Sequence, residues 1–219
     1  MLGWRFLCLF LLLSQMAVAG EFPTAEQVIQ NWIATQREMP VEKVSFQRTT
    51  FDLIFQHQTN QLCEAVYHGD SSVHFTSKAC PPELQQATRP EYKVKIDHSE
   101  YSLSWDTEKV TFFEPDGTSE HTIPRKLQLG WFPSLDIVEH VLPPLFPGPV
   151  NDTYIHKFDW TISDRKPGAI WLKAEPKLAY EKDNDIPSWE IIVNTGTWQT
   201  RAARQLDKTG NREVVMVVR

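Results

Sequence analysis

Histidine side chains, which serve most often as metal ligands and general bases, are spread along this chain without the spacing that a metal site requires. Of the seven histidines, only His68 and His74 are expected to face each other, one on each side of a predicted hairpin turn. With Glu64 they could hold a metal ion, but solvated hairpin histidines explain the pattern more simply. The stretch Asp183-Asn184-Asp185 lacks the glycine and the distal glutamate of a calcium loop. We therefore predict no metal site.

Catalytic groups are equally hard to assemble from the sequence. The chain has no G-x-S-x-G nucleophile elbow, no HExxH pair, no P-loop and no dinucleotide-binding glycine pattern. Glu139 and His140 could form an acid-base pair, but adjacent positions of a helix point about 100° apart. The sequence therefore predicts a protein that is not an enzyme and that uses no cofactor.

The first 19 residues have the pattern of a secretory signal peptide. Arg5 precedes an unbroken apolar run over residues 6–13, and Ala17-Val18-Ala19 supplies the small side chains that a signal peptidase needs. An uncleaved anchor is the alternative, but this run spans only about 12 Å of helix against about 30 Å of hydrocarbon. We expect cleavage after Ala19, a single domain over residues 20–219, and a secreted or periplasmic protein with no membrane-spanning segment left.

Two cysteines remain after this cleavage, because Cys8 leaves with the leader. An even number of cysteines in an oxidising compartment indicates a disulfide, here between Cys63 and Cys80. Closing so short a loop stabilises a fold by roughly 3 kcal/mol. A catalytic thiol or a pair of metal ligands is the alternative, but the CxxC spacing and the neighbouring histidines are absent.

The body left after cleavage is acidic and rich in aromatic side chains. Arg5 is the only charged residue of the leader, so its removal lowers the formal net charge from −6 to −7. The leader takes only Trp4, Phe6 and Phe10 from the aromatic residues. So many aromatics exclude a disordered chain, and the acidic balance argues against a nucleic-acid partner.

Apolar spacing predicts a helix followed by sheet. Between Pro23 and Pro40, Thr24 and Gln27 form a capping box, and the apolar positions after them have helical spacing to residue 36. A second, short helix is expected over residues 134–142, before a proline cluster, and a helical turn over 178–183. Strands are expected over residues 44–56, 61–68, 73–77, 92–96, 101–105, 110–114, 118–123, 154–162, 169–174, 189–194, 198–206 and 212–218.

Three stretches of the chain resemble the bacterial lipoprotein-carrier, or LolA-like, family. They are the helix over residues 26–36 leading to Val44-Ser45-Phe46-Gln47, the strand beginning Arg89-Pro90, and the aromatic pattern over residues 104–116. The chain departs from the family where its second strand arginine is Lys93. The resemblance implies an α+β fold: a curved, incomplete antiparallel β-barrel of about ten strands, with the N-terminal helix and the short inserted helix packed on its concave side. It also implies an apolar concave surface that receives acyl chains.

Aromatic side chains on the predicted strands are the remaining candidates for a binding site. They either form a closed core or line a cavity for a hydrophobic ligand, a lipid or acyl chain. We expect a monomer that binds or carries such a ligand; the alternative is a cell-envelope interaction module with a protein partner and no small ligand. The candidate cavity-lining residues are Phe46, Phe75, Tyr92, Trp105, Phe113, Trp160 and Trp171.

Overall fold

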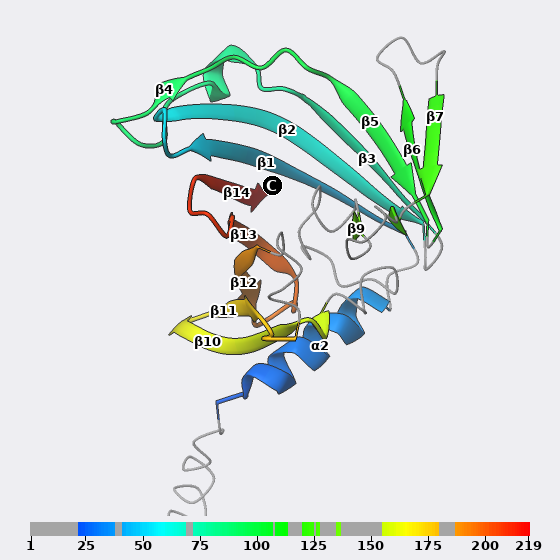
Figure 1. The fold of residues 1–219 in the computed structure, drawn as a ribbon. Helices are drawn as coiled ribbons and strands as arrows, with labels where there is room; N and C mark the ends of the chain where they lie inside the picture. The colour runs from blue at the N-terminus through cyan, green and yellow to red at the C-terminus, as the bar shows by residue number, and fades with distance from the viewer. Residues whose placement is uncertain are drawn as a thin grey trace, which may run out of the picture.

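The chain folds into an open, curved antiparallel sheet with the helix α2 (Ala25–Arg37) beside one end of it (Figure 1). This computed structural model describes residues 22–37, 41–68, 72–106, 108–113, 120–124, 126–127, 135–136, 155–179 and 187–219. The sheet does not close, because β10 and β7 end the strand order and do not pair with each other. The predicted α+β class and incomplete barrel are therefore confirmed.

Within the described residues, twelve strands form this sheet, against about ten expected, and their order is β10-β11-β12-β13-β14-β1-β2-β3-β5-β6-β7, with β4 paired to β2. Two further short strands of the described part, β8 and β9, pair with each other in a separate small sheet. The strand bounds are β1 Val41–Asp52, β2 His57–His68, β3 Ser72–Ala79, β4 Lys93–Val94, β5 Tyr101–Trp105, β6 Lys109–Phe113, β7 Glu120–Pro124, β8 Lys126–Leu127, β9 Leu135–Asp136, β10 Phe158–Lys166, β11 Ala169–Pro176, β12 Ser188–Asn194, β13 Thr200–Leu206 and β14 Arg212–Val218; a 3-10 turn, η1, covers Pro82–Leu84.

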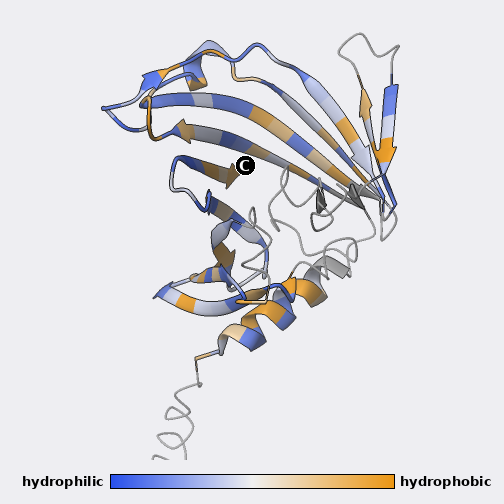
Figure 2. Cartoon of the chain, viewed as in Figure 1, coloured by the Kyte–Doolittle hydropathy of each residue, from blue (hydrophilic) through white to orange (hydrophobic). Residues whose placement is uncertain are grey.

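One face of the sheet carries the hydrophobic core, and we call it the inner face. Its residues follow from the register: Val44 lies opposite Ala65, which lies opposite Phe75, which lies opposite Leu103. All four are buried, and the cluster they belong to continues through β14 and β13 to β10. Figure 2 shows the corresponding alternation of hydrophobic and hydrophilic residues along the strands.

The helix α2 begins and packs as its sequence predicts. The backbone N–H of Gln27 donates to Thr24 Oγ1 at 3.2 Å, and the backbone N–H of Thr24 donates to Gln27 Oε1 at 2.8 Å, which is a capping box. Val28 and Trp32, one turn apart, are fully buried in the core. The Trp32 indole N–H also donates to Thr200 Oγ1 of β13 at 3.1 Å, so α2 is fixed on the inner face.

The first strand ends earlier than its composition predicts. The expected strand over residues 44–56 stops at Asp52, and residues 53–56 form a turn. The Asp52 carboxylate accepts backbone N–H groups from Ile54 and Phe55 at 3.1 and 3.0 Å, a local pairing that competes with the ladder. Phe55, expected to alternate on a strand, is 69% exposed in this turn.

Two other expected elements differ from the structure. The strand predicted over residues 92–96 is reduced to the two residues of β4, because β3 already pairs with β2 from Gln61 onward; of the remaining residues 57–60, His57 and Gln58 pair with β4. In the predicted helix over residues 134–142, Leu135 and Asp136 form β9 instead, paired with β8. The rest of that helix, and most of the turn expected over 178–183, lie outside the described residues.

Candidate functional site

Four of the seven aromatic candidates share the inner face. Phe46, Phe75 and Trp105 are buried core residues, with the Phe46 and Phe75 ring centroids 6.2 Å apart. Trp160 is partly buried and packs edge-on against Trp32 of α2, with ring centroids 6.1 Å apart. The structure therefore brings these four into one apolar cluster.

The other three candidates lie elsewhere. Tyr92 packs edge-on against Phe51, with ring centroids 5.1 Å apart. Phe113 lies opposite Ser102, in the strand phase adjacent to inward-facing Leu103, and its ring centroid is 5.8 Å from that of His74. Trp171 lies beneath Lys166 Nζ, which is 4.8 Å from its ring centroid. These three residues do not join the inner-face cluster, so the seven do not form one site.

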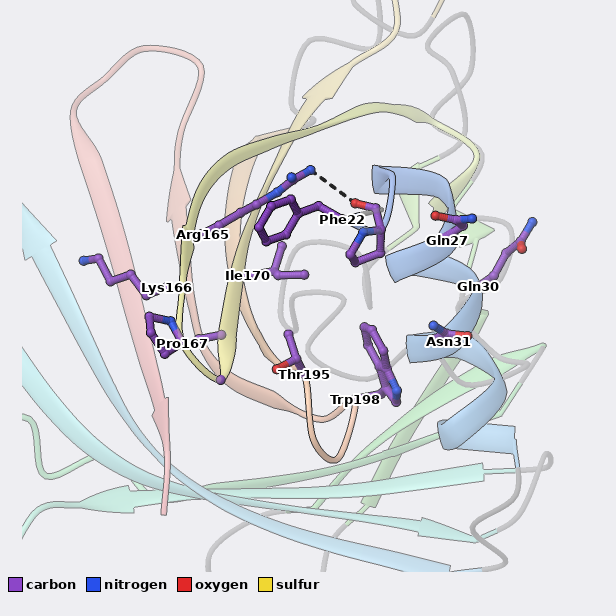
Figure 3. Close-up of a pocket in the computed structure, with 13 residues that line it drawn as sticks. Phe22, Gln27, Gln30, Asn31, Arg165, Lys166, Pro167, Ile170, Thr195 and Trp198 are labelled. Atoms are coloured by element: carbon purple, nitrogen blue, oxygen red, sulfur yellow. Dashed lines mark hydrogen bonds between the residues drawn. The ribbon is translucent and has the colours of Figure 1, made fainter. Parts of the chain in front are cut away.

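A pocket of about 970 Å³ lies between the start of α2, the β10–β11 turn and the loop before β13 (Figure 3). None of the seven predicted aromatics lines it. Its lining residues are Phe22, Pro23, Gln27, Gln30, Asn31, Arg165, Lys166, Pro167, Gly168, Ala169, Ile170, Thr195 and Trp198.

One wall of the pocket is held in place by Arg165. Its Nη2 donates to the carbonyl oxygen of Pro23 at 3.2 Å, and its guanidinium carbon lies 5.2 Å from the centre of the Phe22 ring. Gly168 forms the turn that returns the chain to β11, with a φ of 77° that favours glycine. The segment before α2 is therefore joined to the β10–β11 hairpin across the pocket.

The opposite wall carries a strained tryptophan. Trp198 has a φ of 53°, which is costly for a bulky side chain. A tight turn imposes it: the Trp198 N–H donates to the Asn194 carbonyl at 2.7 Å, and the Gly196 N–H donates to Asn194 Oδ1 at 2.9 Å. Figure 3 shows the indole among the side chains that line the pocket, on the side of Asn31 of α2.

The chemistry of the lining favours binding over catalysis. Phe22, Pro23, Ile170 and Trp198 provide apolar surface, and the amide side chains of α2 and the cations of β10 provide polar groups. Among the described residues that line the pocket there is no carboxylate, histidine or thiol. This set can hold an apolar molecule with a polar or anionic end, and it supplies no acid-base pair.

The two cysteines are buried and unbonded in the structure. Cys63 Sγ lies 3.6 Å from Ser77 Oγ, and burial raises the pKa of the Cys63 thiol to about 11. Burial also raises the pKa of Cys80. Both thiols are therefore protonated and poorly nucleophilic at neutral pH. The disulfide between them stays a prediction.

The two histidines considered for a metal are not opposite each other in the hairpin register. His74 Nε2 lies 3.1 Å from the hydroxyl of Ser102, and β2 places Val66, not His68, opposite it. In the described part of the chain, no three histidine, cysteine, aspartate or glutamate side chains are grouped to hold a metal ion. None of the described helices is long and apolar enough to cross a membrane.

Sequence reasoning missed the pocket because its walls are turns and helix-surface residues. Its strongest signals were the turn pattern Lys166-Pro167-Gly168 and a tryptophan two residues after Gly196. Neither signal indicates which segments meet in space. Phe22 lay between the leader and the capping box, where no periodic pattern applies.

Comparison with known proteins gives likenesses of structure only. No protein-family model and no curated protein matches the sequence. Similar solved structures include a LolA superfamily protein from Nitrosomonas europaea, with 7% identity and a TM-score of 0.41 over 90% of this chain and 92% of that one. A putative outer membrane lipoprotein-sorting protein domain from Vibrio parahaemolyticus has 7% identity and a TM-score of 0.41 over 89% of each chain.

A third similar structure is LprF from Mycobacterium bovis, with 9% identity and a TM-score of 0.42 over 89% of this chain and 91% of that one. The family that the sequence resembles is thus among the similar structures. At these TM-scores the likenesses carry no argument about ligand, partner or activity.

Proposed function

We propose that this protein is an exported, non-enzymatic binder of a hydrophobic ligand, a lipid or acyl chain, held in the pocket between α2 and the β10–β11 turn. The observation that carries the proposal is the pocket itself, about 970 Å³ with Phe22, Ile170 and Trp198 among its lining residues. Ligand sites in proteins commonly measure about 300 to 1,000 Å³ and combine apolar walls with a few polar groups.

The strained Trp198 supports the same proposal. Its φ of 53° costs on the order of 1 to 3 kcal/mol, and residues held in this way cluster at binding sites. The turn from Asn194 keeps the indole at the pocket wall. A tryptophan at this position offers a ligand a large, rigid apolar surface at little cost in side-chain entropy.

The inner-face aromatics are assigned different roles in this proposal. Phe46, Phe75 and Trp105 are packed in the core, so a ligand would reach them only if the inner face opened. Trp160 is partly buried beside Trp32 and has surface to offer. We therefore assign the first three to stability, and Trp160, which does not line the pocket, to the support of Trp32 and α2.

Two substitutions on α2 form a matched test. Asn31 and Ala34 are both exposed, but only Asn31 lines the pocket. Binding of a fluorescent fatty acid, cis-parinaric acid, is measured by titration. We expect Asn31→Trp to fill the pocket and weaken binding at least tenfold, about 1.4 kcal/mol, and Ala34→Trp to bind as the wild type does. Equal binding by the two variants would reject this pocket as the site.

An interaction module is the second candidate, and one observation favours it. Ile54 and Phe55 in the β1–β2 turn are 61% and 69% exposed, which is costly unless a partner covers them. In a module of this kind, Asn31→Trp would leave binding of the protein partner unchanged. Replacing Ile54 and Phe55 with serine would abolish that binding.

A further inference from the structure

The inner face changes from apolar to polar toward one end of β1. Beyond Val44 and Phe46, the same phase of this strand continues with Arg48, Thr50 and Asp52, which are half-buried, while the buried side chains here are Thr49 and Phe51 of the other phase. On β2 the same phase also becomes polar, whereas on β14 the residues Met216 and Val214 are still buried and apolar, and the change comes only at Arg212. The register places Arg48 opposite Gln61 and Met216, Thr50 opposite Thr59 and Val214, and Asp52 opposite His57 and Arg212.

A second, smaller pocket of about 370 Å³ lies at this polar end. It is far from a purely hydrophobic site, because hydroxyl, amide and cationic side chains make up most of its lining. The lining residues are Thr50, Phe51, Asp52, Ile54, His57, Thr59, Lys95, Asn211 and Arg212.

The positive charges around this pocket lack full compensation. Arg212 forms no salt bridge with a carboxylate of the described residues, and neither does Lys95. Asp52, the one carboxylate that lines the pocket, accepts two backbone N–H groups of its own turn through Oδ1. The Asp52 carboxylate therefore stabilises the turn through these hydrogen bonds and only partly offsets the positive charges beside it.

Arg48 adds a second guanidinium behind the pocket. Its Nη1 donates to the Tyr101 hydroxyl at 3.0 Å, while its Nε is buried and has no hydrogen-bond partner among the described residues. Burial and the positive charge of Arg48 lower the pKa of Arg212, against the opposing effect of Asp207. The positive charges of Arg48 and Arg212 thus repel each other, and a bound anion would offset that repulsion.

We infer that this pocket binds an anionic oxygen group, a phosphate or a carboxylate, with Arg212 and Lys95 as its cationic contacts and the hydroxyls of Thr50 and Thr59 as further donors. Guanidinium groups bind such oxygens through two parallel hydrogen bonds, and an ammonium group acts as a point charge beside them. This site goes beyond the proposed function and does not depend on the pocket at α2.

The anion could belong to a small free molecule or to a lipid headgroup. An exposed apolar side chain at the edge of the pocket is relevant to the second source. Ile54 lines the same pocket and is 61% exposed. A headgroup in the pocket would bring lipid chains toward this side chain. The experiment therefore has one arm for each source.

The test uses Arg212→Gln and a matched control, Arg201→Gln. Arg201 is an exposed arginine of β13 that lines neither pocket, so both variants lose the same charge. In the first arm, inorganic phosphate is titrated by calorimetry. In the second, the proteins are floated with vesicles of phosphatidylglycerol and with vesicles of phosphatidylcholine.

We expect the wild type and Arg201→Gln to bind in at least one arm, and Arg212→Gln to bind at least tenfold more weakly in that arm. Phosphate binding alone assigns a free anion, and binding to phosphatidylglycerol but not to phosphatidylcholine assigns a headgroup. Lys95→Gln, at another exposed position of the pocket, should weaken the same arm, which keeps the test informative if Arg212→Gln folds poorly. Equal loss in Arg201→Gln, or no binding by the wild type, would overturn the inference.

Discussion

The side chain of Glu213 is a buried carboxylate that two arginines neutralise. Its Oε1 accepts from Arg89 Nη2 at 2.6 Å and from Arg204 Nε at 2.9 Å, and the residue is 2% exposed. Arg89 also lies over the Phe51 ring, 4.1 Å from its centre. The Arg89-Pro90 motif, one of the stretches that resemble the lipoprotein-carrier family, thus has a structural role here in joining the segment after β3 to β14.

Removing this carboxylate should destabilise the protein and change its response to acid. Burial opposes ionisation of Glu213, but the hydrogen bonds from Arg89 and Arg204 outweigh it and hold its pKa below the ordinary value. The ionised group therefore stabilises the fold above its unfolded pKa, and that contribution is lost as the pH falls through the lower folded pKa. We expect Glu213→Gln to cost about 2 kcal/mol at pH 7 and to flatten the acid side of the stability curve, measured by urea unfolding.

The control for this prediction is Glu64→Gln. Glu64 accepts from Lys43 Nζ at 2.7 Å, but both side chains are exposed, so the cost should be under about 1 kcal/mol. If the two substitutions destabilise equally, the Glu213 pair contributes no more than a surface ion pair does.

At the scale of elements, the sequence predicts well where local patterns and packing agree. The β14 bounds match the expected residues 212–218, and the capping box at Thr24 sets the start of α2 as predicted. Prediction failed where one side chain or one neighbouring strand decided the outcome: Asp52 ends β1, and β3 leaves little of β2 for β4. The pocket at α2 was missed for a related reason, since Trp198 and Arg165 meet α2 only through the tertiary arrangement.

The docking of α2 should couple stability to ligand binding. Trp32 is fully buried, and its indole N–H donates to Thr200 Oγ1 at 3.1 Å. Replacing Trp32 with Phe removes that donor and leaves a void, so we expect a loss of about 2 to 3 kcal/mol in urea unfolding. Because Gln27, Gln30 and Asn31 of α2 line the pocket, cis-parinaric acid should bind more weakly as well. Unchanged stability would mean that α2 is held by other contacts.

For the whole molecule, the expected leader and the pocket at α2 lie next to each other in the sequence. Cleavage after Ala19 would leave only Gly20 and Glu21 before Phe22, which lines the pocket together with Pro23. If it stayed attached, an apolar leader two residues from this pocket would act as an intramolecular competitor, with an effective concentration on the order of mM for a short linker. Processing would therefore do more than release the protein, because it would also free the pocket for its ligand.

This coupling predicts a difference between two forms of the chain. Protein recovered after export should have the intact mass of residues 20–219, measured by mass spectrometry, and should bind cis-parinaric acid. The unprocessed chain should bind the same probe at least tenfold more weakly, because its leader competes for Phe22, Ile170 and Trp198. In Asn31→Trp, whose pocket is filled, the two forms should bind equally poorly. A full-length mass after export would contradict the predicted cleavage. Equal binding of the probe by the two wild-type forms would show that the leader does not compete for the pocket.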